Sequence, residues 1–357
     1  MRRRFTPSEG LGPLYNSSSC AACHEQPVTG GGAPNYRNFF LVALGTEGSQ
    51  VPLVVINLPS QVLPAFYGPG FGAGRIVVPP VGPPGVAITM AQRAGPPLFG
   101  TGLFELVTNA TIIALSDPDD ADADGISGRF NRAPGLLVGR LGFKSQANNI
   151  ESFIRGAARN QMGITTNPVA GSGAAVSLAS CRLLQVPTGG PNDPITDEDS
   201  IADPEISVPD FADIIAFCRF LAPPRRLALT ESSARGQTFF EQVGCTKCHL
   251  MNLTTSLGTI QPFTDLLLHN MGPGLADGIS QGSPQPSLDG DTTTGDEWRT
   301  APLWGAALNA PYMHDGRAGT LLEAIDTHGG EATGVLAAFN ALSAAQQADV
   351  IAFLETL

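Results

Sequence analysis

The sequence has little positive charge and no long apolar run. Its 20 Lys and Arg residues against 32 Asp and Glu residues give a formal net charge of −12. This charge disfavours nucleic acid and anionic membrane surfaces as partners and favours a basic protein. No stretch is long and apolar enough to span a bilayer, and residues 5–19 do not form the apolar region of a signal peptide. We therefore expect no membrane span, and a chain that is a mature or trimmed form or lacks its true start.

Histidine is scarce, which narrows the search for metal ligands. Only five histidines occur, and none lies between Glu25 and Cys248. Glycine and proline, by contrast, are plentiful, with 42 and 30 residues in a chain that is 42% hydrophobic. Such a composition predicts a globular protein with much irregular backbone rather than a disordered one.

Two short motifs, Cys20–His24 and Cys245–His249, contain four of the six cysteines. Each has the pattern C-x-x-C-H, in which two thiols add to the vinyl groups of one haem and the adjacent His ligates the iron. Paired zinc half-sites or redox dithiols are the alternatives, but a zinc site needs a second Cys or His pair near each motif, and neither motif has one. The sequence therefore predicts two covalently bound haem c groups. Their attachment and proximal residues are Cys20, Cys23, His24, Cys245, Cys248 and His249.

Two cysteines, Cys181 and Cys218, lie outside these motifs. Covalent haem attachment normally takes place outside the cytoplasm, so we expect a periplasmic or otherwise extracytoplasmic protein. In such an oxidising compartment a disulfide between the two cysteines is one expectation. Two buried thiols that behave as small apolar side chains are the alternative.

The chain repeats one plan twice. An amphipathic run follows each haem motif, at residues 210–221 and 348–357, and the paired prolines at 223–224 end the first run. We predict a mainly α protein with much irregular loop, made of two cytochrome-c-like haem domains at 1–223 and 224–357. A Gly- and Pro-rich insertion enlarges the first domain. Its predicted features are short strands at 51–56, 74–78 and 86–90 and an exposed loop at 189–209.

Three histidines remain as candidates for a sixth iron ligand. Thr320 and Glu323 predict a capping box that begins a short helix, which Gly329 and Gly330 end. His328 then lies in the last turn of a rigid element, a suitable mount for an axial ligand, although a His at a helix C-terminus also interacts with the helix dipole. His269 and His314 fit structural roles beside a haem better.

The first haem has no second His in its half of the chain. Its iron is open, water-ligated, or bound by Met90 or Met162, and we favour an open position because small oxidants need one. Peroxide cleavage also needs a proton-transfer group. Glu105 is the candidate, because it lies in the apolar stretch 103–107, where a charge is costly without a role. An exposed residue at the start of a helix is the alternative.

An acidic segment is a candidate cation site. Asp120, Asp122 and Asp124 precede Gly125 with the spacing of a calcium loop. The twelfth position of that loop is Asn131 rather than a bidentate Glu, so a solvated acidic turn is the alternative.

Several segments resemble known families. Residues 311–316 and 320–325 are similar to the C-terminal signature of bacterial di-haem cytochrome c peroxidases, whose architecture is shared by the enzyme that matures methylamine dehydrogenase. Residues 262–265 with 269–272 are similar to another segment of these proteins. Residues 99–105 and 116–125 resemble the di-haem oxidoreductases sometimes labelled thiol oxidoreductases. The resemblance covers both haem motifs and most of the second half.

The resemblance implies further ligands. In the peroxidases the distal ligand of the second haem lies fourteen residues after the position of His314, which is His328 here. The peroxidases usually carry Met there and the maturation enzyme carries Tyr, so His implies a bis-His haem with a lower potential than a Met-ligated one. The resemblance also implies calcium between the haems, bound by the carbonyls of Asn309 and Pro311 and by an unassigned ligand of the first domain.

The leading function is therefore an oxidoreductase that reduces hydrogen peroxide, or another small oxidant, at the N-terminal haem. The C-terminal haem would relay electrons from a small donor protein, a cytochrome c or a cupredoxin. One alternative is a di-haem oxidase that acts on a protein or organic substrate. The other is a non-catalytic electron-transfer subunit of a larger complex, which predicts two six-coordinate, low-spin haems.

Overall fold

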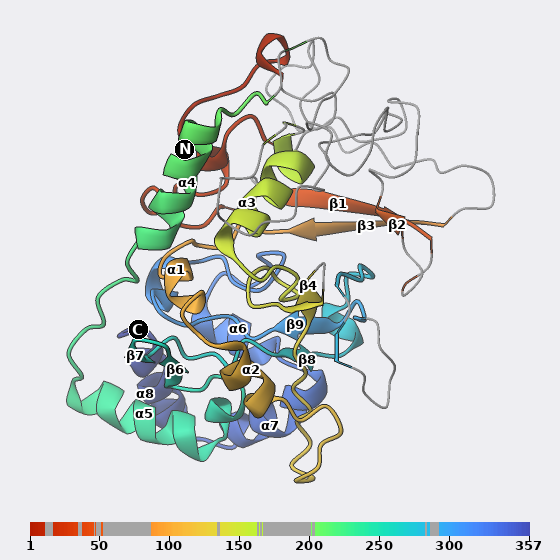
Figure 1. Ribbon diagram of the computed structural model, residues 1–357. Helices are drawn as coiled ribbons and strands as arrows, with labels where there is room; N and C mark the ends of the chain where they lie inside the picture. Colours follow the sequence, from red (N-terminus) through yellow and green to blue (C-terminus); the bar gives the residue numbers. More distant parts are fainter. Residues whose placement is uncertain are drawn as a thin grey trace.

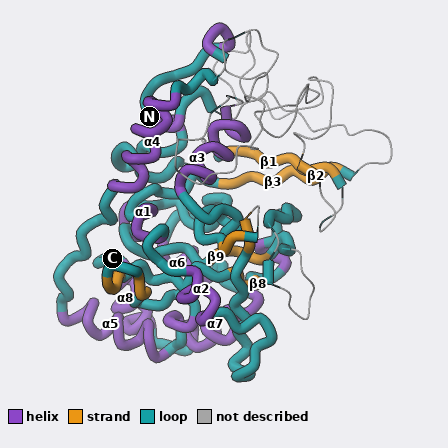
Figure 2. Tube along the Cα trace, in the orientation of Figure 1, coloured by secondary structure: helices purple, strands orange, loops and turns teal. Residues whose placement is uncertain are grey.

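The computed structural model describes residues 1–10, 17–34, 38–45, 47, 51–52, 87–133, 136–162, 164, 166, 201, 204–282, 284–285 and 293–357. In this part of the chain short helices and short strands are joined by long loops (Figure 1, Figure 2). None of the helices found there combines the length and the apolar character that crossing a bilayer requires. The expectation of a mainly helical protein with much irregular loop is confirmed at this level.

The helices are all short. They are α1 (Thr101–Phe104), α2 (Asn109–Leu115), α3 (Ile150–Ala157), α4 (Val208–Phe220), α5 (Glu231–Gln242), α6 (Leu321–Asp326), α7 (Thr333–Asn340) and α8 (Ala344–Leu354). Single turns of 3₁₀ helix begin both haem motifs, η2 (Cys20–Ala22) and η7 (Cys245–Lys247), and a further one, η10 (Gly330–Ala332), precedes α7. The capping box predicted at Thr320 is present at the start of α6, and Ser343 forms another at the start of α8.

The strands form small antiparallel sheets. The largest has the order β2-β1-β3, with β1 (Phe39–Leu44) paired to β3 (Ile88–Arg93) over its whole length and to β2 (Val51–Pro52) at one end. The remaining pairs are β4 (Arg132–Ala133) with β5 (Leu137–Val138), β6 (Leu253–Thr255) with β7 (Gly258–Ile260), and β8 (Leu268–Asn270) with β9 (Glu297–Arg299).

The predicted strands can be compared only in part. The strand expected at 86–90 is confirmed as β3, shifted by two residues. The strand expected at 51–56 begins with β2, but residues 53–60 and the strand expected at 74–78 lie outside the described residues. The prediction of an exposed loop at 189–209 is wrong at its C-terminal end, because α4 already begins at Val208. The side chain of Ser207 caps this helix by accepting a hydrogen bond from the amide of Asp210, and Pro209 lies in its first turn. Residues 189–200 lie outside the described part.

The two larger apolar cores of the described residues lie at opposite ends of the molecule. The core beneath α5 and α8 is aromatic and contains Phe240, Phe263, Phe339 and Phe353. These helices and α7 lie together at the lower end of Figure 1, with α3, α4 and the β1–β3 sheet at the upper end. The larger core gathers side chains from α1 to α4, but four members come from beyond residue 223, namely Leu253, Leu266, Leu267 and Trp304. The two halves therefore share a core, and the boundary at residue 223 stays a prediction.

Cys218 lies buried in α4, within the larger core, as a free thiol. Burial raises the pKa of this thiol to about 12, so the group is protonated and behaves as a small apolar side chain. Cys181, its expected disulfide partner, lies outside the described residues.

Candidate functional site

The two C-x-x-C-H motifs adopt the same backbone turn. The amide of His24 donates to the carbonyl of Cys20 at 3.1 Å, and the amide of His249 donates to the carbonyl of Cys245 at 3.0 Å. The turn keeps the two thiols and the imidazole of one motif within a single short segment. Cys20, Cys245 and Cys248 are thiols that form no disulfide, which is the form that adds to a haem vinyl group.

His249 has the protonation state of an iron ligand. Its Nδ1 contacts the carbonyl of Phe263 at 2.9 Å, and burial lowers the pKa of the imidazole to about 4. A neutral ring that donates its only proton from Nδ1 keeps the lone pair of Nε2 free for a metal.

His328 has the same arrangement, although its place in the fold differs from the prediction. Helix α6 ends at Asp326 and is capped by Thr327, so His328 lies just beyond the helix rather than in its last turn. Its Nδ1 still contacts the carbonyl of Ala324 at 2.8 Å, and burial lowers the pKa of the ring. The lone pair of Nε2 is therefore again free to bind a metal.

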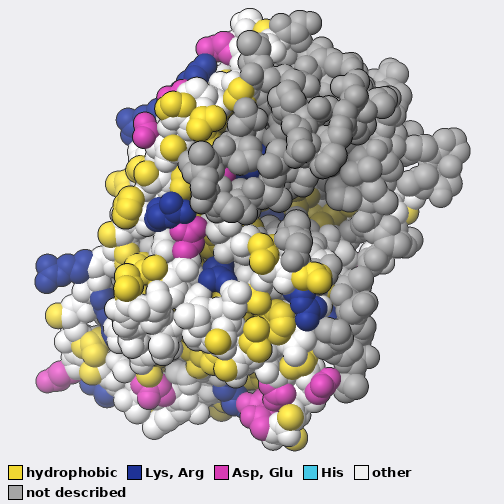
Figure 3. Space-filling view, in the orientation of Figure 1, with side chains coloured by type: hydrophobic (Ala, Val, Ile, Leu, Met, Phe, Trp, Pro, Cys, Tyr) yellow, Lys and Arg dark blue, Asp and Glu magenta, His cyan; other side chains and the backbone are white. Residues whose placement is uncertain are grey.

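The rings of His249 and His328 lie close together, with a separation of their centres that suits a metal between them. Their centroids are 6.5 Å apart and their planes are inclined by 57°. An ion bonded to the near nitrogen of each ring at about 2 Å would separate the two ring centres by about 6 Å. The pair therefore fits a haem iron held between two imidazoles. The face shown in Figure 3 presents no histidine side chain among the residues that it colours.

His24 is alone in its half of the chain. Its Nδ1 atom is buried and makes no hydrogen bond, and burial lowers the pKa of the ring, although the nearby carbonyls of Gly31 and Pro96 favour protonation. Gly95 packs against the motif so closely that a Cβ atom there would lie 2.7 Å from the carbonyl oxygen of Cys23. The buried ring has a lowered pKa and is therefore neutral, as an iron ligand must be, but its Nδ1 lacks the carbonyl contact that His249 and His328 make.

A cavity of about 530 Å³ lies beside the first motif. Cys20, Met162 and Phe217 belong to its lining, and its volume is in the range of cofactor sites. Met90 lies in β3 and is not part of this lining. Of the two methionines predicted as alternative ligands, the structure therefore brings Met162 to the cavity that Cys20 lines.

Glu105 lies between helices rather than in that cavity. One carboxylate oxygen accepts the amide of Ile150 at the start of α3, at 2.9 Å, and the other accepts Nε of Arg219 in α4, at 2.6 Å. Its proton-transfer role stays a prediction, but these contacts favour a structural role that joins α1, α3 and α4.

We expect Glu105→Ala to lower stability rather than peroxide turnover. The change leaves a helix-start amide and a guanidinium without their acceptor, at a cost of about 1–3 kcal/mol. Thermal denaturation and peroxide-dependent turnover of the haem-loaded protein measure the two effects. An unchanged melting temperature with a turnover number reduced a hundredfold would instead identify Glu105 as the proton-transfer group.

The acidic segment forms a cluster whose members differ from those predicted. Carboxylate oxygens of Asp117, Asp120 and Asp122 lie within 4.8 Å of one another. Asp124 instead pairs with Lys247 of the second haem motif at 2.9 Å. The residues that could hold a cation here are therefore Asp117, Asp120 and Asp122, whereas Asp124 ties the segment to the second motif.

Asn38 is a candidate ligand that sequence reasoning missed. It is fully buried, its Nδ2 donates to the carbonyl of Asp315 at 2.7 Å, and its Oδ1 makes no hydrogen bond. The side-chain oxygen of Asn309 is buried and unpartnered as well. Free amide and carbonyl oxygens are the ligands that calcium prefers. Asn38 is thus a candidate for the first-domain ligand that the sequence left unassigned.

A second polar cluster joins the two halves of the chain. The indole of Trp298 stacks on His314 with ring centroids 3.8 Å apart, and the ammonium of Lys144 lies 3.9 Å from the centre of the same indole. Lys144 is fully buried and donates to the carbonyls of Thr294, Gly295 and Glu297.

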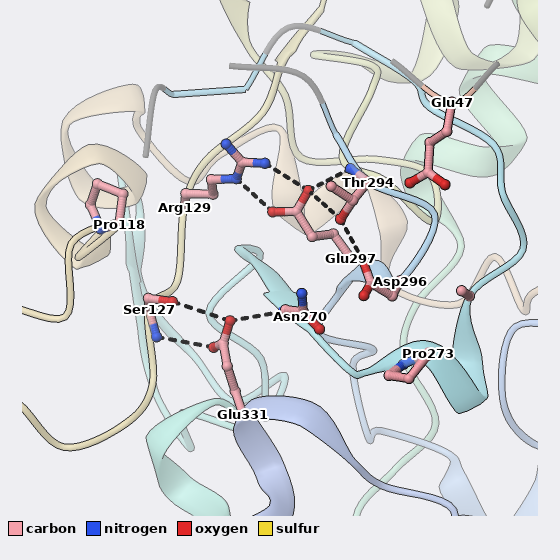
Figure 4. A pocket seen from close by; sticks show the side chains of 11 residues that line it. Glu47, Pro118, Ser127, Arg129, Asn270, Pro273, Thr294, Asp296, Glu297 and Glu331 are labelled. Carbon is pink, nitrogen blue, oxygen red and sulfur yellow. Dashed lines mark hydrogen bonds and ion pairs between the residues drawn. The ribbon is translucent and has the colours of Figure 1, made fainter. Parts of the chain in front are cut away.

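A polar cavity of about 360 Å³ lies nearby (Figure 4). Its wall contains Arg129, whose guanidinium donates two hydrogen bonds to the carboxylate of Glu297. Glu331 enters the same wall and is held by Ser127 and Asn270. Since Ser127 and Arg129 belong to the first half and the others to the second, this wall is another contact between the halves.

Two like turns, each with two thiols and a neutral His, define a protein built to carry two haems. The comparison with protein families agrees. Residues 86–357 match the family described as "Di-haem oxidoreductase, putative peroxidase". The match covers more than half of the chain, which therefore belongs to the di-haem oxidoreductase family.

Solved structures give weaker likenesses. The chain is 24% identical to hydrazine synthase of Kuenenia stuttgartiensis over 42% of this chain and 56% of that one, with a TM-score of 0.30. It is 25% identical to a MauG-like protein associated with microbial copper homeostasis over 44% of this chain and 55% of that one, also with a TM-score of 0.30. The matched region thus spans little more than half the length of these structures. No curated protein matches the chain.

Proposed function

We propose that this protein is a di-haem c oxidoreductase that reduces hydrogen peroxide at its N-terminal haem with electrons relayed by its C-terminal haem. Covalent haem would be held by Cys20 and Cys23 in the first half and by Cys245 and Cys248 in the second. When bound, haem supplies an iron that changes its oxidation state and binds small oxidants at a free coordination position.

One observation carries the proposal, namely the unequal supply of imidazoles. The rings of His249 and His328 lie 6.5 Å apart, so the two residues would together hold the C-terminal haem, which would then serve electron transfer. His24 is the only His of the first half, which leaves one axial position without an imidazole. A haem with both axial positions occupied would transfer electrons, whereas a haem with one free position could bind a small molecule.

The remaining parts of the proposal concern partners and ions. The net charge of −12 suits a basic donor protein, such as a cytochrome c or a cupredoxin, through complementary electrostatics. Calcium is proposed at Asn38, Asn309 and Pro311 and at the cluster of Asp117, Asp120 and Asp122. Covalent attachment of haem argues for a periplasmic or otherwise extracytoplasmic location.

The spin state of the ferric protein tests the proposal. We expect EPR spectra with one low-spin bis-His signal and one high-spin signal, and anaerobic addition of hydrogen peroxide should abolish the high-spin signal alone. Two low-spin signals without any reaction with peroxide would rule the proposal out.

Met162 favours a second candidate function, an electron carrier, because it lines the same cavity as Cys20. We expect Met162→Ala to leave the spectra of the ferric protein unchanged, since the peroxidase proposal assigns no bond to this sulfur. Met90→Ala is the matched control. Conversion of a low-spin signal to a high-spin one in Met162→Ala alone would support the carrier instead.

A further inference from the structure

The carboxylate of Glu331 is held by four hydrogen bonds. One oxygen accepts Nδ1 of His269 at 2.8 Å and the amide of Ser127 at 3.0 Å. The other accepts the amide of Asn270 at 2.8 Å and the hydroxyl of Ser127 at 3.2 Å. Figure 4 shows the contacts with Ser127 and Asn270 from the cavity side. All four donors lie outside the segment that carries Glu331, so this carboxylate is a fixed link to β8 and to the first half.

His269 is itself fixed on both sides. Its Nε2 contacts the carboxylate of Asp265 at 2.8 Å, opposite the contact with Glu331. Burial alone would lower the pKa of His269, but the two carboxylates raise it well above its usual value. Both ring nitrogens therefore carry protons and donate. Nδ1 also lies 3.7 Å from the sulfur of Cys248, which places the network against the second haem motif.

Among the described residues, by contrast, the hydrogen bonds of His328 all go to carbonyls of α6. Its amide and its Nδ1 bond to the carbonyls of Ile325 and Ala324. Helix α6 has six residues, too few to be stable without outside contacts. Leu321 and Ile325 anchor the helix on the aromatic core, but the loop after the helix needs a second anchor.

The turn at 329–331 supplies that anchor. Gly330 has a φ of +56°, and a Cβ atom there would lie 2.1 Å from the carbonyl oxygen of Asn270. The turn therefore packs directly against the end of β8, and the hydrogen bonds of Glu331 hold it there. His328 lies between the core anchor of α6 and this second anchor.

We propose that Glu331 is a positioning residue that holds His328 at the distal face of the C-terminal haem and makes this ligation depend on Ser127 in the first half. The inference rests on the proposed role of His328 as iron ligand. Loss of the link would let His328 move away from the iron and would create a second coordination position open to small molecules.

The test uses the haem-loaded full-length protein and the variant Glu331→Gln. The amide replaces one acceptor oxygen by a donor, which then faces protein donors and breaks part of the link. We expect the high-spin fraction at the C-terminal haem to rise about tenfold in ferric EPR spectra, as loss of a charged hydrogen bond implies. We also expect added imidazole to restore the low-spin signal, which a purely structural role would not predict.

Two further variants keep the test decisive. Asp349→Asn is the matched control. The carboxylate of Asp349 likewise accepts several hydrogen bonds, from Arg235 and Ser232, and its side chain is 12% exposed, as is that of Glu331. This substitution should lower stability and leave the spectrum unchanged. Ser127→Ala, which retains the backbone donor, should shift the spectrum in the same direction as Glu331→Gln but less.

The outcomes separate the inference from the proposed function. A bis-His signal in the wild type that persists unchanged in Glu331→Gln and Ser127→Ala would overturn the inference alone. A wild-type protein without a bis-His signal would overturn the ligand assignment and the inference with it.

Discussion

Cys20→Ala with Cys23→Ala is expected to abolish peroxide reduction and to leave the bis-His spectrum intact. Without its two thioethers the N-terminal haem is not retained, so haem content falls from two per chain to one. Turnover with peroxide should fall about a thousandfold or more, since the open coordination position is lost. Pyridine haemochrome analysis gives the haem content, and EPR shows which haem remains.

The reciprocal pair of substitutions is the matched control. Cys245→Ala with Cys248→Ala also leaves one haem per chain, but the remaining ferric haem should be high-spin. Its first reaction with peroxide should persist, whereas turnover with an electron donor should stop. A bis-His signal in this variant would place the ligand pair on the wrong motif.

Lys144→Met is expected to destabilise the protein by about 1–3 kcal/mol, because it leaves three buried carbonyl oxygens without their donor. The ammonium donates to three carbonyls of the second half from a fully buried position in the first half. Methionine fills much of the same volume but donates nothing. Denaturation of the haem-loaded variant by guanidinium chloride measures the loss.

Lys247→Met controls for the removal of a lysine charge. Its partner is Asp124, but its side chain is 41% exposed, and exposed ion pairs contribute less than about 1 kcal/mol. Equal stabilities of the two variants would contradict the role assigned to the buried ammonium.

The parts that the sequence could predict are local. Cys-x-x-Cys-His spacing, the capping boxes at Thr320 and Ser343 and the amphipathic runs of α4 and α8 depend on neighbours along the chain, and each is found in the structure. The helix predicted to contain His328 is two residues shorter than expected, because Thr327 caps α6 before the glycines do. The error is small since only local geometry is involved.

The parts that the sequence could not predict depend on long-range packing. Glu105 attracted attention as a charge in an apolar stretch, but its partners are Ile150 and Arg219, far along the chain. No pattern marks Asn38 or Lys144 as buried, because their acceptors come from the other half. Asp124 belongs to a calcium-loop pattern, but the distant Lys247 competes for it. The fold, rather than the local sequence, determines which hydrogen bonds and ion pairs these side chains form.

The larger core draws Leu253, Leu266, Leu267 and Trp304 into contact with helices that precede residue 223. A fragment that begins at residue 224 would expose these four side chains to water and would be prone to self-association. Folding of the second half therefore depends on contacts with the first half. Dissection of the protein is better done by point substitution than by truncation.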